Sequence, residues 1–364
     1  MKKKQTINIF IKNIFKLDKG IIFIILVLFA INILIQYSAS EKVVSKMISD
    51  IGYLILSLVL MIIIANLNIN ILKHIAVPMY IFSILLLLLV LFAGVSSHGA
   101  KRWINLGLKF QPSELCKISV PLMICYYLNL KNNIIKYSDY FVGFILTVIP
   151  FILIIKQPDL GTGILVLCSG LLVLFYFGIS WKIILGNIFL ALSGAPIIWH
   201  FLYDYQKFRI LTLLNPQSDK LGKGYHIIQG IIGIGSGGFI GKGYLSGTQI
   251  HLDFIPEKNT DFVVSVIAEE FGYLGIVLVL TLYLILILKC IGIMVNAKDS
   301  NSQALIGSLT LSFCLYVFIN MGMVAGIVPV VGVPLPFISY GGTATLVLAL
   351  QFGIVLLIAK ENNY

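Results

Sequence analysis

Long apolar runs recur along this chain of 364 residues, and no other feature constrains its fold as strongly. Each run reaches about 18 residues or more, which is the length of an α-helix that crosses a hydrocarbon layer roughly 30 Å thick. A helix satisfies its own backbone hydrogen bonds, whereas the edges of an open sheet would stay unpaired in lipid. The runs therefore predict an all-α integral membrane protein.

The composition agrees with this prediction. Only 11% of the residues are charged and 59% are hydrophobic, whereas a soluble domain carries roughly 25% charged residues. A chain of this length could bury a large soluble core, but it has too few charges to cover the surface around one. About ten transmembrane helices are predicted, at 21–38, 51–68, 75–95, 115–130, 141–156, 160–179, 181–203, 262–290, 303–327 and 337–359.

The charges predict the orientation in the membrane. An even number of spans places both termini on one side, and the basic N-terminus identifies that side as the cytoplasm. Residues 1–20 have the pattern of a basic amphipathic helix on the membrane surface, although a disordered basic tail fits equally well. The net charge of +11 lies mainly between the spans. Orientation and anionic lipid headgroups explain it better than a nucleic-acid partner does. We expect a multi-pass protein of the cell membrane.

Residues 21–364 are predicted to form a single membrane domain, with one long extracytoplasmic loop at 204–261 between the seventh and eighth spans. The loop contains the stretch GKGYHIIQGIIGIGSGGFIGKGYLSG. Its GIGSGG matches a dinucleotide-binding pattern, but no parallel sheet is predicted around it, and we reject that interpretation. The glycines indicate a backbone that turns tightly or approaches a ligand closely, or else simple flexibility. Apolar residues throughout the loop predict that it packs on the membrane face.

The strongest local motif is PEKNTDFVVSVIAEEFGYLG. Asp261 is predicted to stand at the start of the eighth span, at the outer surface. Ser265, Ala268 and Gly272 follow it on the same helix face, and a face of small residues suits either another helix or a substrate groove. Capping the helix is the alternative role for Asp261, although neighbouring residues could cap the helix equally well.

Two further carboxylates of this motif, Glu269 and Glu270, lie about 12–14 Å deeper along the predicted helix. A carboxylate at such a depth is costly unless it is paired or faces water. A functional site and an internal ion pair that only holds the bundle together are equally good explanations at this point.

The stretch HGAKRWINLGLKFQPSELCK follows the third span and concentrates basic residues at the outer interface. It contains Arg102, Lys109 and Lys117, and Glu114 is spaced to pair with Lys117 on one helix face. Such a basic cluster would suit a lipid that carries a pyrophosphate. Anchoring at the interface through Trp103 is the alternative, which is favoured when this stretch is considered alone.

Two other stretches interrupt the apolar pattern. KQPDLGT places Lys156 and Asp159 in a tight outer turn, where a local salt bridge would suffice to explain them. GIVPVVGVPLPFISYGGT contains three prolines, which indicates either a re-entrant segment or an ordinary outer turn. Neither the five cysteines nor the five histidines have the spacing of a disulfide framework or a metal site.

Taken together, six strings in order resemble the SEDS family of shape, elongation, division and sporulation proteins. They are GAKRWINLG, FQPSELCK, QPDLGT, GSGGFIGKG, TDFVVSVIAEEFGYLG and PLPFISYGG, within residues 90–360. FRILTLLNPQSDKLGKGYHIIQ and GIVPVVGVPLP are similar to the RodA branch, which serves cell elongation. Departures from the family pattern are small, and none removes Asp261; they are Gly230, Ile231, Asn259 and Thr343.

The resemblance implies an enzyme, a peptidoglycan glycosyltransferase that polymerises lipid II into glycan strands. It implies that Asp261 is the catalytic residue, and a general base would activate the sugar hydroxyl. Basic side chains would neutralise the leaving pyrophosphate on its undecaprenyl lipid; the candidates are Arg102, Lys109, Lys117 and Lys156. Gln111 and Glu114 would orient that basic set. Supporting roles are expected for Asp159, Glu269, Glu270 and Ser339.

Several questions stay open on the sequence. A divalent cation, Mg²⁺ or Mn²⁺, could assist or replace some basic side chains, with Asp159, Glu269 or Glu270 as ligands. The family resemblance implies a class B penicillin-binding protein, the transpeptidase, as partner, together with other membrane proteins of the elongation complex. A lipid II flippase is one alternative class, because intramembrane glutamates and broken helices also occur in transporters. A scaffold for wall enzymes without chemistry of its own is the other.

Overall fold

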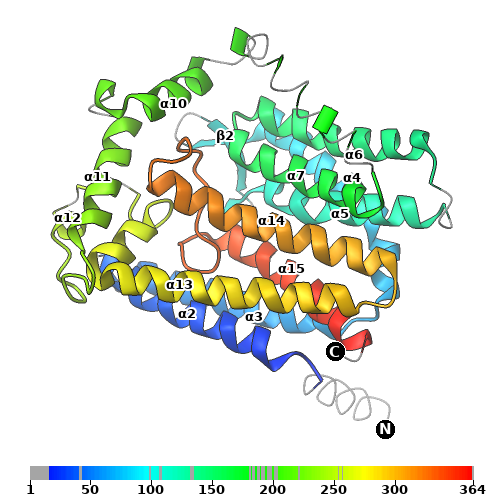
Figure 1. Ribbon diagram of the computed structural model, residues 1–364, viewed down its shortest axis with the longest axis horizontal. Coiled ribbons are helices and arrows are strands. Elements are labelled where there is room, and N and C mark those ends of the chain that lie inside the picture. The colour runs from blue at the N-terminus through cyan, green and yellow to red at the C-terminus, as the bar shows by residue number, and fades with distance from the viewer. Residues whose placement is uncertain are drawn as a thin grey trace.

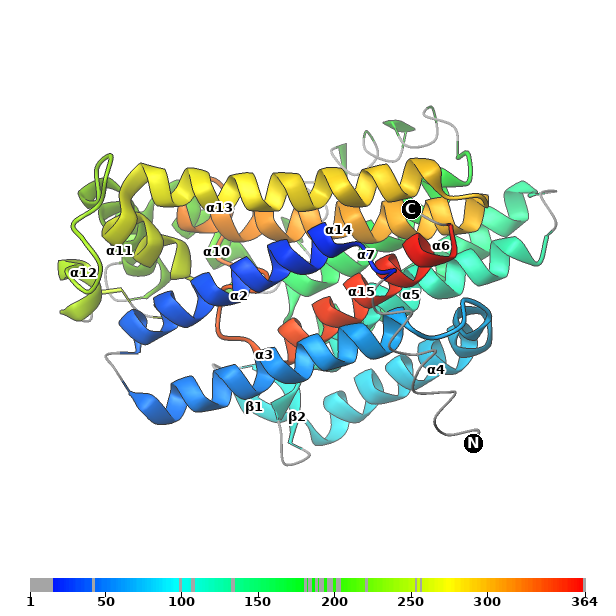
Figure 2. The ribbon, with the colours of Figure 1, turned by 90° about the horizontal axis from the view of Figure 1, so that it is seen from below.

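A computed structural model describes residues 16–362, with gaps at 41, 42, 98, 99, 106–108, 132–134, 180, 181, 183, 184, 187, 188, 190–192, 195–198, 201–203, 220, 221, 253 and 256. Long helices lie side by side along one axis (Figures 1 and 2). They are α2 (Lys19–Ala39), α3 (Val44–Ala65), α4 (Asn70–Ala93), α5 (Pro112–Asn129), α6 (Tyr137–Lys156), α7 (Leu160–Tyr176), α13 (Val263–Asn296), α14 (Ser300–Val324) and α15 (Gly342–Glu361).

The long helices agree with the predicted membrane spans. Seven of the described helices are long and apolar enough to cross a membrane, and α7 is a shorter apolar helix of 17 residues. Each predicted span other than 181–203 overlaps one long helix. That span lies largely outside the described residues, as does most of the N-terminal segment 1–20. The total of ten spans therefore stays a prediction, as does the division into a basic segment and one domain.

Helix α5 occupies the centre of the bundle. It packs against α4, α6, α7, α14 and α15, and most of its residues are buried, including the polar Glu114 and Lys117. It begins with Pro112, whose fixed φ and missing N–H suit the first helical position. Its polar N-terminal turn is therefore surrounded by protein instead of lipid.

A small sheet departs from the all-helical expectation. Strands β1 (Val95–Ser97), β2 (Ala100–Asn105) and β3 (Lys109–Phe110) form an antiparallel sheet in the order β1-β2-β3, between α4 and α5. Because side chains alternate along a strand, Arg102 shares a face of β2 with the buried Ile104. The sheet thus directs Arg102 toward the bundle.

The predicted loop at 204–261 is mostly helical. It contains α10 (Asp204–Leu214), the short 3₁₀ helix η1 (Pro216–Ser218), α11 (Lys223–Ser236) and α12 (Thr248–His251). Helix α11 packs on α13 and α14, and Figure 1 shows α10, α11 and α12 grouped at one end of the bundle. The glycine-rich stretch was expected to be an irregular backbone, and its first half is instead a helix.

The proline-rich segment between α14 and α15 is non-helical, and it is largely buried from Leu335 to Ser339. Phe337 is 1% exposed and packs against the rings of Phe29, Phe313 and Phe352. Its φ is +63°, a left-handed conformation that is uncommon for a bulky residue. The ring contacts hold it there, and non-helical backbone at this depth is tolerated because protein surrounds it.

Helix α13 is not continuous, although one uninterrupted span was predicted. Gly272 lies within it at φ +65° and ψ −160°, which breaks the helical path. A Cβ at Gly272 would lie 2.4 Å from the backbone nitrogen of Gly241. The break therefore lets the chain after α11 approach α13 backbone to backbone.

Candidate functional site

Asp261 lies two residues before the first residue of α13 and is partly exposed. Its backbone carbonyl accepts a hydrogen bond from the Asn320 side chain of α14, at 3.1 Å. The same amide group donates to the carbonyl of Val333 at 2.6 Å. A Cβ at Gly332 would lie 3.4 Å from the Asp261 carboxylate. The carboxylate therefore faces the proline-rich segment between α14 and α15, and the Asn320 side chain joins that segment to the residues before α13.

Ser339 also joins the proline-rich segment to the residues before α13. Its hydroxyl donates to the carbonyl of Thr260 and accepts from the backbone N–H of Leu335. Asn259 contributes its carbonyl, which accepts from the backbone N–H of Tyr340 at 2.9 Å. Ser339 thus supports Asp261 by holding the backbone beside it.

Glu114 and Lys117 form a buried ion pair on α5. The carboxylate and ammonium groups are 2.6 Å apart, and each side chain is 5% exposed. The ammonium group of Lys117 also lies 3.8 Å from the ring centroid of Tyr316 on α14. The predicted pairing at this spacing is present, and Tyr316 adds a cation–π contact to it.

Asp159 connects two other elements at the turn between α6 and α7. Its carboxylate accepts a hydrogen bond from the Gln111 side chain at 2.8 Å and lies 3.9 Å from the Arg102 guanidinium. It also caps α7 through the backbone N–H of Thr162. The local salt bridge with Lys156 that the sequence indicated is not formed, because Lys156 points outward at the end of α6.

Tyr316 is the residue on which the site converges. The carboxylates of Glu114, Asp159 and Asp261 all lie within electrostatic range of its hydroxyl. Tyr316 is 2% exposed, and its hydroxyl has no hydrogen-bond partner in the described part of the chain. Carboxylates from α5, from the α6–α7 turn and from the residues before α13 therefore act electrostatically on one buried phenol of α14.

Lys109 and Lys156 lie at the edge of this group. Both are exposed, and neither side chain forms an ion pair with a residue that the structure describes. The backbone carbonyl of Lys109 accepts from the Thr343 hydroxyl of α15 at 2.9 Å, which positions β3. Their charges are available to a ligand, whereas those of Arg102 and Lys117 are shared with carboxylates.

Glu269 belongs to a different network. Its carboxylate is 0% exposed and accepts from Lys242 at 2.6 Å, Thr248 at 3.2 Å and the backbone N–H groups of Gln249 and Ile250. All of these donors lie in the chain between α11 and α13. Glu269 thus holds this segment to α13, which is the structural role left open by the sequence.

Glu270 also points away from Asp159. It accepts from the Ser38 hydroxyl of α2 and from the backbone N–H of Leu245, at 3.2 Å for the latter. Glu269 and Glu270 therefore both contact the segment between α11 and α13, whereas Asp159 contacts Gln111 and Arg102. Within the described residues, no group of three or more His, Cys, Asp and Glu side chains could hold a metal ion.

The small-residue face of α13 packs against α11 and not against an open groove. The Ser265 hydroxyl donates to the carbonyl of Gly230 at 3.2 Å. A Cβ at Gly237 would lie 1.8 Å from the carbonyl oxygen of Ala268. Gly237, which follows the last residue of α11, is therefore needed for close approach to α13, and the ligand that the sequence offered as one explanation is not required.

Tyr316 and Asn320 were missed by the sequence-based prediction. Both are polar residues inside the predicted span 303–327, where buried hydrogen-bonding groups are costly. That cost was considered for charged residues but not for a tyrosine and an asparagine. Both residues lie outside the sequence motifs, so their position in the site could not be predicted from those motifs.

These features define a polytopic membrane protein with a polar site at one end of its helical bundle. A model of the FtsW, RodA and SpoVE family, described as cell cycle proteins, matches residues 13–364. The chain belongs to this family, and the resemblance to SEDS proteins and to RodA is confirmed.

Relatives support this assignment along almost the whole chain. The peptidoglycan glycosyltransferase MrdB of Escherichia coli K12 is 45% identical over 349 residues, covering 95% of this chain and 94% of that protein. A probable peptidoglycan glycosyltransferase FtsW of Geobacter metallireducens is 33% identical over 363 residues, covering 95% of both.

Solved structures share the fold. A chain from a structure on the coordination of polymerization and crosslinking by a peptidoglycan synthase complex is 32% identical, with a TM-score of 0.83 over 96% of this chain and 98% of that one. The crystal structure of the rod shape determining protein RodA of Thermus thermophilus is 28% identical, with a TM-score of 0.72 over the same shares.

Proposed function

We propose that this chain is a peptidoglycan glycosyltransferase that polymerises lipid II on the outer membrane face during cell elongation, with Asp261 as general base. The names of its relatives support the reaction class. Helix α14 carries the site, because its Tyr316 contacts the ammonium group of Lys117 and its Asn320 donates to the carbonyl of Asp261.

In the proposed reaction, the 4-hydroxyl of the acceptor sugar attacks the anomeric carbon of a growing chain. A C–O bond forms there while the bond from that carbon to undecaprenyl pyrophosphate breaks. Asp261 accepts the hydroxyl proton, which contributes about 10²–10⁴-fold to the rate. Its partly exposed position at the start of α13 supports access by a large, water-soluble sugar.

The leaving pyrophosphate develops negative charge and requires cations. Lys109, Lys156 and Arg102 are proposed to contact it, because their side chains are exposed or partly exposed. Lys117 and Glu114 orient this basic set through their ion pair, and Gln111 does so through Asp159. Mg²⁺ or Mn²⁺ near Asp159 is an alternative countercharge, which loss of activity in EDTA and its recovery with either ion would support.

The decisive experiment compares wild type with Asp261→Asn in lipid II polymerisation by the purified protein. We expect at least about 100-fold less glycan product, because the base is lost, with lipid II binding unchanged. Asp204→Asn, an exposed aspartate of α10, is the matched control and should polymerise normally. Product formation by Asp261→Asn at the wild-type rate would refute the role of Asp261.

We also propose that both termini are cytoplasmic and that the partner is a class B penicillin-binding protein within the elongation complex. The related chain from a peptidoglycan synthase complex supports such a partner. Adding the purified transpeptidase to the polymerisation assay, and recovering the two proteins as one complex, tests this proposal.

A further inference from the structure

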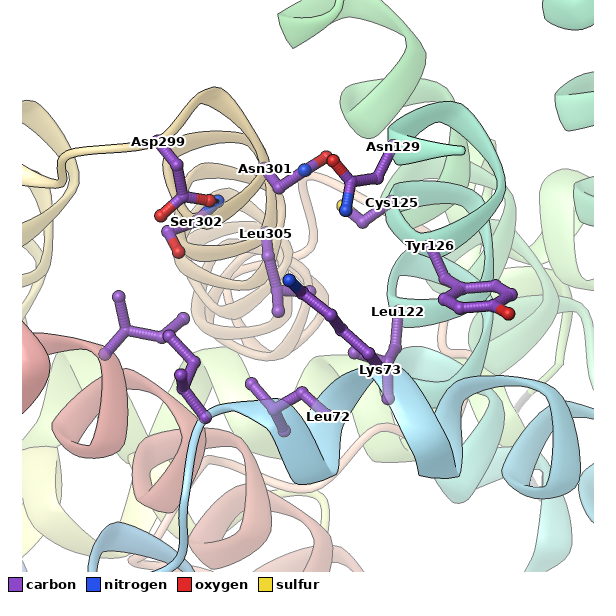
Figure 3. A pocket seen from close by; sticks show the side chains of 12 residues that line it. Leu72, Lys73, Leu122, Cys125, Tyr126, Asn129, Asp299, Asn301, Ser302 and Leu305 are labelled. Atoms are coloured by element: carbon purple, nitrogen blue, oxygen red, sulfur yellow. Dashed lines mark hydrogen bonds between the residues drawn. The ribbon is translucent and has the colours of Figure 1, made fainter. Parts of the chain in front are cut away.

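A cavity lies at the end of the bundle opposite to Asp261. Figure 3 shows it between the first turns of α4 and α14 and the last turns of α5. Its volume is about 360 Å³. Ser302 lines it, and Asn320 of the same helix bonds to the Asp261 backbone. At 1.5 Å per residue, these two positions on α14 are about 27 Å apart, close to the thickness of a hydrocarbon layer.

The wall of this cavity carries charge of both signs. Lys73 projects its ammonium group into the cavity from α4, and Asp299 stands at the start of α14 (Figure 3). Neither forms an ion pair with another residue that the structure describes. Asp299 uses one carboxylate oxygen to cap α14 through the backbone N–H of Ser302. Its other oxygen is therefore available to a ligand.

Amide groups and apolar side chains complete the lining. Asn129 and Asn301 face the cavity, and the buried Oδ1 atom of Asn301 has no hydrogen-bond partner among the described residues. Leu72 forms part of the apolar floor and also lines a neighbouring apolar groove between α3, α4, α5 and α15. The other aliphatic residues that line the cavity are Ile69, Leu122, Leu305 and Ile358.

We propose that this cavity binds the phosphoethanolamine headgroup of a membrane phospholipid. The Lys73 ammonium would contact the phosphate, and Asp299 would accept hydrogen bonds from the primary ammonium. The apolar groove beyond Leu72 would accept the start of an acyl chain. An anionic glycerol headgroup fits less well, because it brings no cation to Asp299.

Native mass spectrometry of the purified protein tests this proposal with three lipids of identical acyl chains. They are phosphatidylethanolamine, phosphatidylglycerol and diacylglycerol. We expect the first to bind about fivefold more tightly than the second, a difference of about 1 kcal/mol. Lys73→Gln should weaken binding of both phospholipids. Asp299→Asn keeps a good helix cap. This variant should weaken the binding of phosphatidylethanolamine only to the level of phosphatidylglycerol binding.

Lys19→Gln is the matched control, because Lys19 is an exposed lysine at the same end of the bundle but outside the cavity. An equal loss in that variant, or no loss in Lys73→Gln and Asp299→Asn, would overturn the site. Displacement of the lipid by free phosphoethanolamine at the same concentration would overturn the lipid assignment. Asp261→Asn should bind these lipids normally, which separates this proposal from the proposed enzyme activity.

Discussion

At the scale of residues, hydrogen bonding separates two kinds of buried polar group in this chain. The Glu269 carboxylate accepts bonds from several donors of one segment and is therefore explained by the fold. The Tyr316 hydroxyl is equally buried and has no partner in the described part of the chain. Because an unsatisfied buried group costs about 1–3 kcal/mol, its retention beside Asp261 and Lys117 points to a role with substrate.

Tyr316→Phe tests that role. The variant keeps the ring that Lys117 contacts and removes only the hydroxyl. We expect unchanged or higher thermal stability in detergent, but about tenfold slower polymerisation, because one hydrogen bond to the reacting lipid is lost.

Tyr283→Phe provides the contrast. The Tyr283 hydroxyl donates to the carbonyl of Pro336 at 2.6 Å, so its removal should lower stability by about 1 kcal/mol. If Tyr316→Phe lowered stability in the same way while polymerising normally, its hydroxyl would have a structural role only.

At the scale of elements, the packing of the end of α11 and of the turn that follows it on α13 depends on the absence of side chains. Gly237 and Gly241 lie so close to the α13 backbone that a Cβ would be 1.8 Å from the Ala268 oxygen and 2.2 Å from the Glu270 oxygen. Glu269 then fastens the chain beyond α11 to the same helix. The position of the segment before Asp261 therefore depends on these backbone contacts.

Gly237→Ala and Gly235→Ala should change stability in opposite directions. The first forces α11 away from α13, at a cost of about 1–3 kcal/mol. The second adds a methyl group where nothing lies within 4 Å, and it should gain about 0.5–1 kcal/mol from better helix propensity. Thermal unfolding in detergent measures both effects. Equal stabilities of the two variants would contradict the close packing of these helices.

At the scale of the whole molecule, the bundle separates two polar regions along its long axis. The start of α13, which Asp261 precedes, lies toward one end, and the cavity that Lys73 and Asp299 line lies between the first turns of α4 and α14 toward the other (Figure 2 shows these helices). Apolar helices join the two regions, and many of their large side chains are exposed, as expected for surfaces in contact with lipid. This arrangement predicts that the two ends face opposite sides of the membrane.

Single-cysteine labelling tests the orientation in intact cells. In a variant without the five native cysteines, Lys109→Cys should react with a membrane-impermeant maleimide, because it is exposed at the outer end. Lys298→Cys, exposed at the other end, should react only after the membrane is permeabilised. The reverse pattern would place Asp261 in the cytoplasm and contradict the proposed reaction.

Local patterns in the chain were sufficient to predict nine long helices that the structure describes, the position of Asp261 before α13 and the pairing of Glu114 with Lys117. Each depends on hydrophobicity or on spacing within one helix, and both can be read along the sequence. The helical nature of the 204–261 region, the break at Gly272 and the convergence on Tyr316 depended on the tertiary structure. These features arise from contacts between segments far apart in the chain, and packing decides which polar groups meet and which are satisfied.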